Sequence, residues 1–149
     1  DRSKAAQHAD KEKVRAERQK ARQGMMAGEE RYLGARDKGV QRRLARDVVD
    51  ARFTAGELVL PMLFLVVMLT FIDSVLLQLI ALFAMWGLFL VVAVDAFFVG
   101  RAVKKKVAKK HGAENLEGGL AWYGAMRSIQ MRGLRIPKPQ VARFTKFED

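Results

Sequence analysis

The sequence predicts an all-α membrane protein in which two transmembrane helices form a hairpin. Basic cytoplasmic N- and C-terminal extensions flank the hairpin and carry interfacial amphipathic helices. Two observations predict this class. The segment between Arg52 and Arg101 contains no Lys or Arg, although the whole chain has 27 of them. The same segment is almost continuously apolar, whereas a soluble core would interleave charges at the period of a helix or a strand.

The apolar segment is long enough for two spans, because a bilayer core of about 30 Å takes about 20 apolar residues as a helix. We expect the first transmembrane helix over residues 54–72, a periplasmic turn at 73–74 and the second transmembrane helix over residues 75–100. A buried hairpin in a soluble all-α protein is the alternative. Neither run has the polar face that such a hairpin would turn to water.

Basic residues flank both spans and are missing from the turn between them. This asymmetry predicts a multi-pass protein of the plasma membrane with both termini in the cytoplasm. Basic side chains close to the spans are candidates for binding anionic lipid headgroups, such as those of cardiolipin or phosphatidylinositol lipids. The candidates are Arg42, Arg43, Arg46, Lys104, Lys105 and Lys106.

Residues 1–39 form a basic cytoplasmic arm followed by a loop. The first 23 residues are good helix formers without an apolar stripe, so we expect a solvated helix, a disordered segment or an arm on an acidic surface. Glycines punctuate residues 24–39, and apolar side chains in such a loop usually pack on the protein's own helices or on a partner. The candidates for docking are Met25, Met26, Tyr32 and Leu33.

Residues 40–53 predict an interfacial helix that leads into the first span. Val40, Leu44 and Val48 share one face of such a helix, and the arginines point elsewhere. This pattern is typical of helices that lie in the membrane interface.

Residues 101–149 form a basic cytoplasmic tail, whose lysine run continues the second helix. We expect an amphipathic helix at about 118–134 and an extended strap at 135–149. Aromatic anchors with arginines indicate a helix at the headgroup level or one docked on a partner, and prolines stiffen the strap for a partner groove. The docking candidates are Trp122, Tyr123, Met126, Arg127, Arg132, Arg135, Pro137 and Pro139.

One ion pair is predicted within the hairpin. Arg52 lies 21 residues before Asp73 and Asp95 lies 21 residues after Ser74, so a rise of about 1.5 Å per residue brings them to similar depth. An unpaired carboxylate at the bilayer centre is unfavourable by about 2.5 to 3.5 kcal/mol. We therefore expect Asp95 to pair with Arg52 or with a basic group of a partner subunit. A proton-carrying role for Asp95 is the alternative, but it lacks a chain of polar neighbours.

No motif in the sequence indicates catalysis or a cofactor. The chain has no Cys, and its two His are far apart in sequence. It has no phosphate-binding glycine loop, no HExxH and no GxSxG. The basic arm lacks the aromatic residues of a single-strand binder. We therefore expect no enzymatic activity, no cofactor, no metal and no nucleic-acid partner.

Three stretches carry a resemblance to a known family: MMAGEERYL, RRLARDVVDAR and WYGAMRSIQMRGLRIPKPQV. Together they resemble a family of two-span actinobacterial membrane proteins of uncharacterised function, over residues from about 24 to 141. The resemblance suggests a supercomplex associating factor, which is a non-catalytic accessory subunit of the respiratory cytochrome bcc and cytochrome c oxidase supercomplex. Such a subunit would stabilise or bridge the complex through its membrane helices and cytoplasmic tails.

Two other classes of function compete with this expectation. The first is a free-standing membrane adaptor that binds anionic lipid or a cytoplasmic partner. The second is an enzyme, a transporter or a proton channel, although two spans with one internal acid have few of the polar groups that transporters use.

Overall fold

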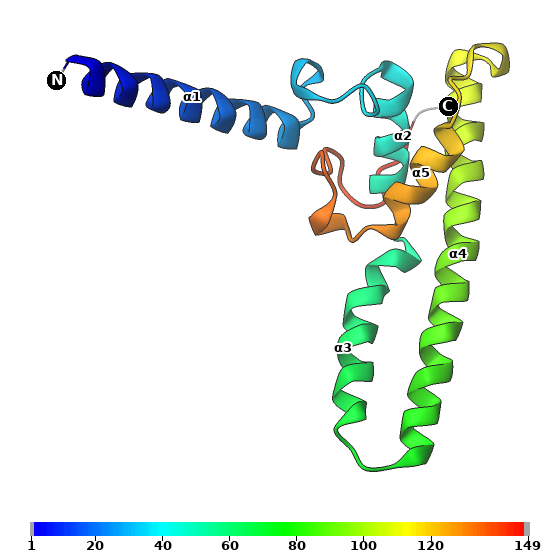
Figure 1. The fold of residues 1–149 in the computed structure, drawn as a ribbon. Coiled ribbons are helices and arrows are strands. Elements are labelled where there is room, and N and C mark those ends of the chain that lie inside the picture. The colour runs from blue at the N-terminus through cyan, green and yellow to red at the C-terminus, as the bar shows by residue number, and fades with distance from the viewer. Residues whose placement is uncertain (1, 148–149) are drawn as a thin grey trace.

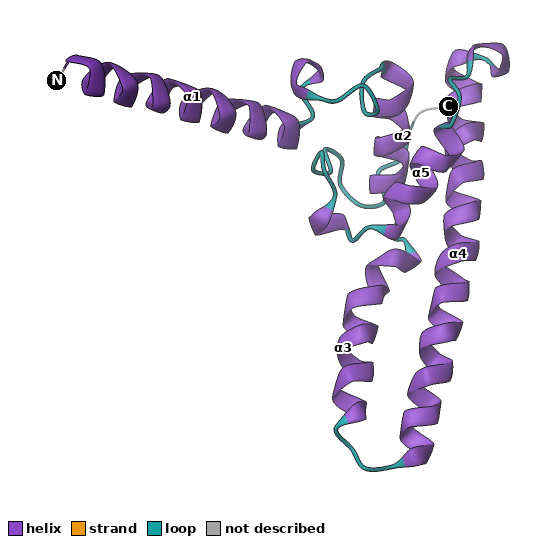
Figure 2. Ribbon diagram, viewed as in Figure 1, coloured by secondary structure: helices purple, strands orange, loops and turns teal. Residues whose placement is uncertain are grey.

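The computed structural model describes residues 2–147, so the first residue of the expected arm and residues 148–149 of the expected strap lie outside it. The described chain is all-α, which confirms that part of the predicted fold class (Figure 2). Short 3-10 turns and loops join its helices. The helices are α1 (Arg2–Ala27), α2 (Val40–Asp50), α3 (Val59–Thr70), α4 (Val75–His111) and α5 (Leu120–Ile129).

The helices α3 and α4 form a hairpin (Figure 1). A 3-10 turn at Ala55–Leu58 leads into α3, and Ser74 caps α4 by accepting a hydrogen bond from the amide of Leu77. Within the described chain, α4 is long and apolar enough to cross a membrane. A second candidate span consists of α2 with residues 55–70, and it bends by 53° at the break.

Apolar side chains cover the outside of the hairpin. No residue of the described helix α3 is buried. Phe71 is 80% exposed, and on α4 Phe83 is 71% and Trp86 66% exposed. Apolar surface of this extent marks contact with a membrane or with other protein.

A compact unit lies at the open end of the hairpin, and we call it the platform. It consists of α2, residues 96–111 of α4, α5 and residues 131–147 (Figure 1). Val99, Val103 and Val107 repeat every fourth residue along one face of α4 and are fully buried. The core residues packed with them are Ala45, Val48, Val49, Leu120 and Tyr123.

Two glycines bring α4 and α5 into close contact. A Cβ atom on Gly100 would lie 2.7 Å from the carbonyl oxygen of Ala121, and one on Gly124 would lie 2.8 Å from a methyl group of Val103. Real Cβ atoms do not approach this closely, so both positions require glycine at this spacing. Small residues thus set the distance between the two helices.

The structure corrects the expectation of an interfacial helix at residues 40–53. The helix ends at Asp50, and Ala45, Val48 and Val49 are buried in the platform core. Of the apolar face that suggested a membrane surface, Leu44 and Val48 pack in the platform core with the valines of α4, whereas Val40 is 68% exposed. The sequence pattern is the same in both cases, because an apolar stripe buries equally well in lipid and in protein.

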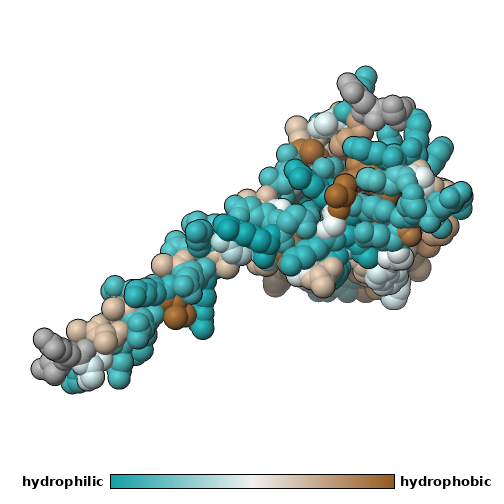
Figure 3. Space-filling view, turned by 90° about the horizontal axis from the view of Figure 1, so that it is seen from above, coloured by the Kyte–Doolittle hydropathy of each residue, from teal (hydrophilic) through white to brown (hydrophobic). Residues whose placement is uncertain are grey.

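The arm at residues 2–27 is the helix α1, which projects away from the platform (Figure 3). Its surface is mainly hydrophilic in this view. The helix ends where Gly28 adopts a φ of 78°, a conformation that glycine favours. The amide of Lys138 donates a hydrogen bond to the carbonyl of Met26 at 2.9 Å, so the C-terminal end of α1 is fixed to the platform.

Candidate functional site

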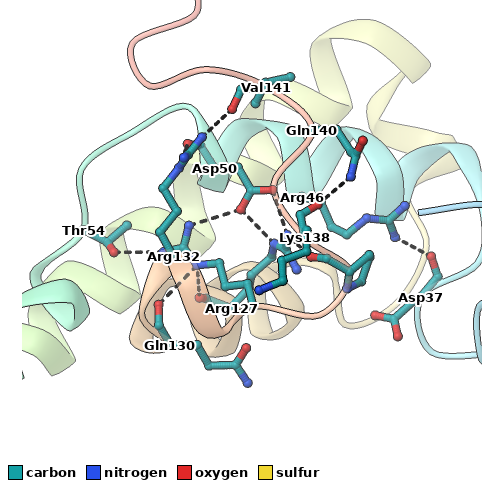
Figure 4. Close-up of polar contacts among 12 residues, drawn as sticks. Asp37, Arg46, Asp50, Thr54, Arg127, Gln130, Arg132, Lys138, Gln140 and Val141 are labelled. Atoms are coloured by element: carbon teal, nitrogen blue, oxygen red, sulfur yellow. Dashed lines mark hydrogen bonds and ion pairs between the residues drawn. The ribbon is translucent and has the colours of Figure 1, made fainter. Parts of the chain in front are cut away.

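A buried polar cluster joins α2, α5 and the C-terminal segment (Figure 4). Asp50, the last residue of α2, is 1% exposed. Its carboxylate accepts two hydrogen bonds from Arg127, at 3.0 and 2.7 Å, and one from Arg135 at 3.1 Å. Arg135 is fully buried and also donates to the hydroxyl of Thr54 at 3.1 Å. The cluster therefore connects the platform to the residue that precedes the first turn of the hairpin.

Two cations share one carboxylate in this cluster, so it carries excess positive charge. Backbone carbonyl oxygens stabilise that charge: Pro137 accepts from Arg127 at 2.8 Å, and Arg127 and Gln130 accept from Nε of Arg135. Burial lowers the pKa of the Arg135 guanidinium below its ordinary value, and the Asp50 carboxylate opposes this shift. Buried ion pairs are tolerated only when hydrogen bonds satisfy their remaining groups, and here the carbonyls supply them.

A second polar group surrounds Tyr123, which is 4% exposed. Its hydroxyl donates a hydrogen bond to Asp37 at 2.8 Å and lies 3.4 Å from Nη1 of Arg46. Desolvation by burial raises the pKa of Tyr123 above its ordinary value. The guanidinium of Arg42 lies over the tyrosine ring, 4.9 Å from its centroid. This group fixes the loop at residues 33–39 onto α5.

Two contacts fix the segment that leads into the first turn of the hairpin and the turn itself. Asp95 lies 3.6 Å from Nη2 of Arg52, and its other oxygen accepts a hydrogen bond from the amide of Ala55 at 2.9 Å. The sequence predicted the contact with Arg52 but not the hydrogen bond from the amide of Ala55. Glu57, which is 7% exposed, pairs with Arg143 at 2.7 Å and ties the C-terminal segment to the first turn of the hairpin. No partner for Glu57 could be predicted from the sequence, because Arg143 lies 86 residues away.

Several residues that we expected at a docking surface lie inside the protein. The structure buries Arg127 and Arg135 against Asp50, so neither faces lipid phosphates or a partner. Pro137 is also buried, and the strap wraps the platform instead of lying open to a partner groove. Arg127 and Arg135 are buried because the buried carboxylate of Asp50 requires cations beside it. Leu33 and Tyr123 are buried as well.

The expected headgroup residues divide in the same way. Arg46 is 5% exposed and donates to the carbonyl of Asp37, and Arg42 donates to the carbonyl of Gly118 at 2.9 Å. These two arginines hold the platform together, which corrects their assignment to lipid. The residues that keep exposed or half-buried positions are Met25, Met26, Tyr32, Arg43, Lys104, Lys105, Lys106, Trp122, Met126, Arg132 and Pro139.

An apolar groove lies between α4 and α5, and two of the expected docking residues line it. It has a volume of about 400 Å³. Phe97 and Trp122, at 60% and 69% exposure, stand at its surface. Ala93, Arg101, Ala125 and Met126 also line it. Trp122 and Met126 are two sequence-predicted docking residues that meet at this groove, whereas its α4 side was not expected.

The groove offers hydrophobic contact with a single adjoining cation, and it has no pair of acid and base groups among its lining residues. Among residues 2–147, no group of three or more His, Asp or Glu side chains could hold a metal ion.

The fold and the groove define a small all-α protein with candidate membrane spans and a basic helical platform. The chain belongs to the family described as protein of unknown function (DUF3043), whose sequence model matches residues 1–144. The family agrees with the expected family of uncharacterised actinobacterial proteins.

Three relatives illustrate this membership. An uncharacterised protein of Mycobacterium leprae is 43% identical over 122 residues, which are 80% of this chain and 52% of that protein. Uncharacterised proteins of Mycobacterium tuberculosis and Mycobacterium bovis are each 38% identical over 144 residues, which are 95% of this chain and 60% of each relative. The chain thus spans little more than half the length of these relatives. No solved structure matches it.

Proposed function

We propose that this chain is the membrane part of a non-catalytic accessory subunit of an actinobacterial cytochrome bcc and cytochrome c oxidase supercomplex. It stabilises or bridges the complex through the hairpin and the platform. The observation that carries the proposal is the apolar surface of the hairpin, where no residue of the described helix α3 is buried. Two helices cover little of each other's surface. The remaining apolar surface is therefore suited to contact with lipid and with the helices of other subunits.

The rigidity of the platform supports a subunit with a defined interface. Two contacts fix the platform to the start of the hairpin: Arg135 with Thr54, and Arg143 with Glu57. Asp95, next to the platform on α4, holds Ala55 as well. The sequence predicted basic extensions whose helices lie on anionic lipid or dock on a partner. A packed platform instead presents the same surface at all times, which favours a fixed partner.

The orientation proposed for the chain follows from its basic residues. The described ends of the chain both lie on the side opposite the turn between α3 and α4 (Figure 1). Arg52 and Arg101 lie near the platform ends of the two spans, and the turn contains no Lys or Arg. The positive-inside rule then places the platform and α1 in the cytoplasm of a plasma-membrane protein.

A free-standing membrane adaptor is the second candidate function, and the helix α1 favours it. This helix is exposed over most of its length, and its basic residues outnumber its acidic ones. It therefore suits an acidic partner or an anionic membrane surface.

Affinity purification of the tagged full-length protein from native membranes in mild detergent tests the proposal. We expect cytochrome bcc and oxidase subunits by mass spectrometry and haem bands in the visible spectrum of the eluate. A wash at about 1 M salt should leave these partners bound, because the Debye length falls to about 3 Å and only packed interfaces persist. An eluate without haem that holds the protein and lipid alone would favour the adaptor.

A further inference from the structure

We propose that the groove between α4 and α5 is a binding site for one anionic phospholipid. An acyl chain lies along the apolar walls, and the phosphate lies at Arg101 and Lys104. This proposal rests on the membrane insertion of the hairpin proposed above. It goes further in naming one site, one ligand class and the two cations that select it.

The walls of the groove suit a flexible hydrocarbon chain. Ala93, Phe97 and Arg101 follow one another at every fourth residue of α4, so they form a straight row along one face. Ala125 and Met126 form the facing wall on α5. Small alanine side chains leave the space open, and the lining is almost wholly apolar up to Arg101. The row continues the exposed apolar surface of α4, so a chain can enter the groove from the bilayer without crossing water.

The positive charge of Arg101 is available to bind a ligand. Other arginines of the platform, such as Arg127 and Arg135, hold a carboxylate or backbone carbonyls. Among the described residues, Arg101 contacts the ring of Phe97, at 5.8 Å from the centroid, and has no carboxylate partner. Its side chain is exposed at the edge of the groove. An arginine in this position can form a charge-assisted hydrogen bond with a phosphate.

Lys104 supplies a second cation one turn further along α4. It lines a neighbouring cavity that shares Ala121 with the groove, so the two cavities adjoin on the same side of α4. Glu117 also lines that second cavity, but Arg42 pairs with it at 3.6 Å. The cytoplasmic end of the groove is therefore positive, which complements an anionic headgroup.

The size of the groove favours a lipid over a partner helix. A helix of about 10 Å diameter would fill a volume of about 400 Å³ with roughly one turn. One turn is a small contact for a helix, whereas an acyl chain can use the whole length of the row. Hydrocarbon gains little by moving from the bilayer to an apolar wall. Recognition therefore depends on the headgroup, and the site should select for charge.

The two tryptophans of the chain make this selectivity measurable. Trp122 lines the groove, and Trp86 lies on the exposed apolar part of α4, three turns before Phe97. In the full-length variant Trp86→Phe, the fluorescence of the remaining Trp122 reports contact of lipid with the groove. In Trp122→Phe, the remaining Trp86 reports contact with bulk lipid. Each is reconstituted into vesicles of phosphatidylcholine that contain a fixed fraction of brominated phosphatidylglycerol or brominated phosphatidylcholine. Bromine near the headgroup end of the acyl chain quenches tryptophan fluorescence on contact.

We expect brominated phosphatidylglycerol to compete for the site of Trp122 about 30-fold better than brominated phosphatidylcholine. Arg101 and Lys104 contribute about 1 kcal/mol each near a membrane surface, and about 1.4 kcal/mol corresponds to a factor of ten. Trp86 should be quenched equally by both. The double change Arg101→Gln and Lys104→Gln should remove the preference at Trp122. The matched double change Lys11→Gln and Lys13→Gln on α1 should leave it intact.

A steric variant separates the groove from the surface charge. The change Ala125→Leu fills the groove and keeps both cations, so it should lower quenching of Trp122 by either lipid. Equal quenching of Trp122 by both brominated lipids would overturn the proposal while leaving membrane insertion intact. Quenching of Trp86 but not Trp122 would also overturn it, because acyl chains would not reach the groove. If Trp86 itself is unquenched, the hairpin is not inserted, and the proposed function fails together with the lipid site.

Discussion

Asp50→Asn tests whether the buried polar cluster holds the platform together. The change removes the charge that Arg127 and Arg135 share and keeps the size of the side chain. Removing one partner of a buried ion pair typically destabilises a protein by about 3 to 5 kcal/mol, because the other charge remains buried without compensation. Small domains are stable by about 5 to 15 kcal/mol, so this loss is a large fraction of the total. We expect Asp50→Asn to unfold the platform in part at ambient temperature.

Hydrogen exchange measured by mass spectrometry on the full-length protein in detergent resolves this effect. We expect amides of α2 and α5 to lose protection, and amides in the middle of α4 near Trp86 to keep it. The matched control is Asp47→Asn, which changes a half-buried carboxylate on the same helix. A change away from a buried network typically lies within about 0.5 kcal/mol of neutral. Protection of α2 and α5 that matches the unchanged protein would refute the role assigned to Asp50.

A compensated variant distinguishes lost charge balance from lost hydrogen bonds. Replacing Asp50, Arg127 and Arg135 together by apolar residues of similar volume removes the excess charge, and such replacements are often neutral or stabilising. We expect the triple variant to be better protected than Asp50→Asn alone. If it is less protected, the hydrogen bonds to Thr54 and to the backbone carbonyls matter more than the charge.

Three further predictions concern packing, the ion pair and pH. Gly100→Ala should destabilise the α4 and α5 contact by about 1 to 3 kcal/mol, because its Cβ would lie 2.7 Å from a backbone oxygen; thermal unfolding should show no such loss for Gly87→Ala, which has open space around it. Cysteines at Arg52 and Asp95 should crosslink in membranes, since the side chains approach to 3.6 Å; no crosslink in neighbouring registers would contradict the pairing. Tyr123 has a raised pKa, so the stability it contributes is complete below the unfolded-state pKa of about 10 and falls as pH rises through the folded value. Tyr123→Phe should lack this alkaline loss in a pH series of unfolding midpoints.

The hairpin could be predicted from the sequence because its signal is local. Residues 75–100 are apolar without interruption except for Asp95, Gln78 and small residues, and the helix α4 begins at Val75 as expected. The all-α class follows from the same runs. The similar depth of Arg52 and Asp95 could also be predicted. Both residues are 21 positions from the same turn, and a helix has a fixed rise per residue.

The platform could not be predicted in the same way because its contacts are distant in sequence. Asp50 and Arg135 are separated by 85 residues, and nothing in the pattern of the strap distinguishes an arginine that pairs with Asp50 from one that faces a phosphate. The expected amphipathic helix at 118–134 is shorter in the structure, since Gln130 adopts an extended conformation after Ile129. A useful signal was present in α2. Its apolar face ends at Asp50. A buried carboxylate requires a basic partner, so this residue indicates that a cation from elsewhere in the chain lies beside it.

The break at residues 51–54 shows how these distant contacts act on the candidate spans. A bend of 53° without a proline in the break would act as a hinge if its backbone were free. Here Arg135 holds the hydroxyl of Thr54, and the amide of Phe144 donates to the carbonyl of Ala51. Asp95 holds the amide of Ala55 from the other side. Arg135 and Phe144 belong to the platform, and Asp95 lies next to it on α4. The helix α3 therefore cannot change its angle without breaking bonds to a buried arginine and a carboxylate. A partner that binds α3 in the membrane therefore fixes the direction of the platform as well, and loosening the Asp50 cluster should weaken both contacts together.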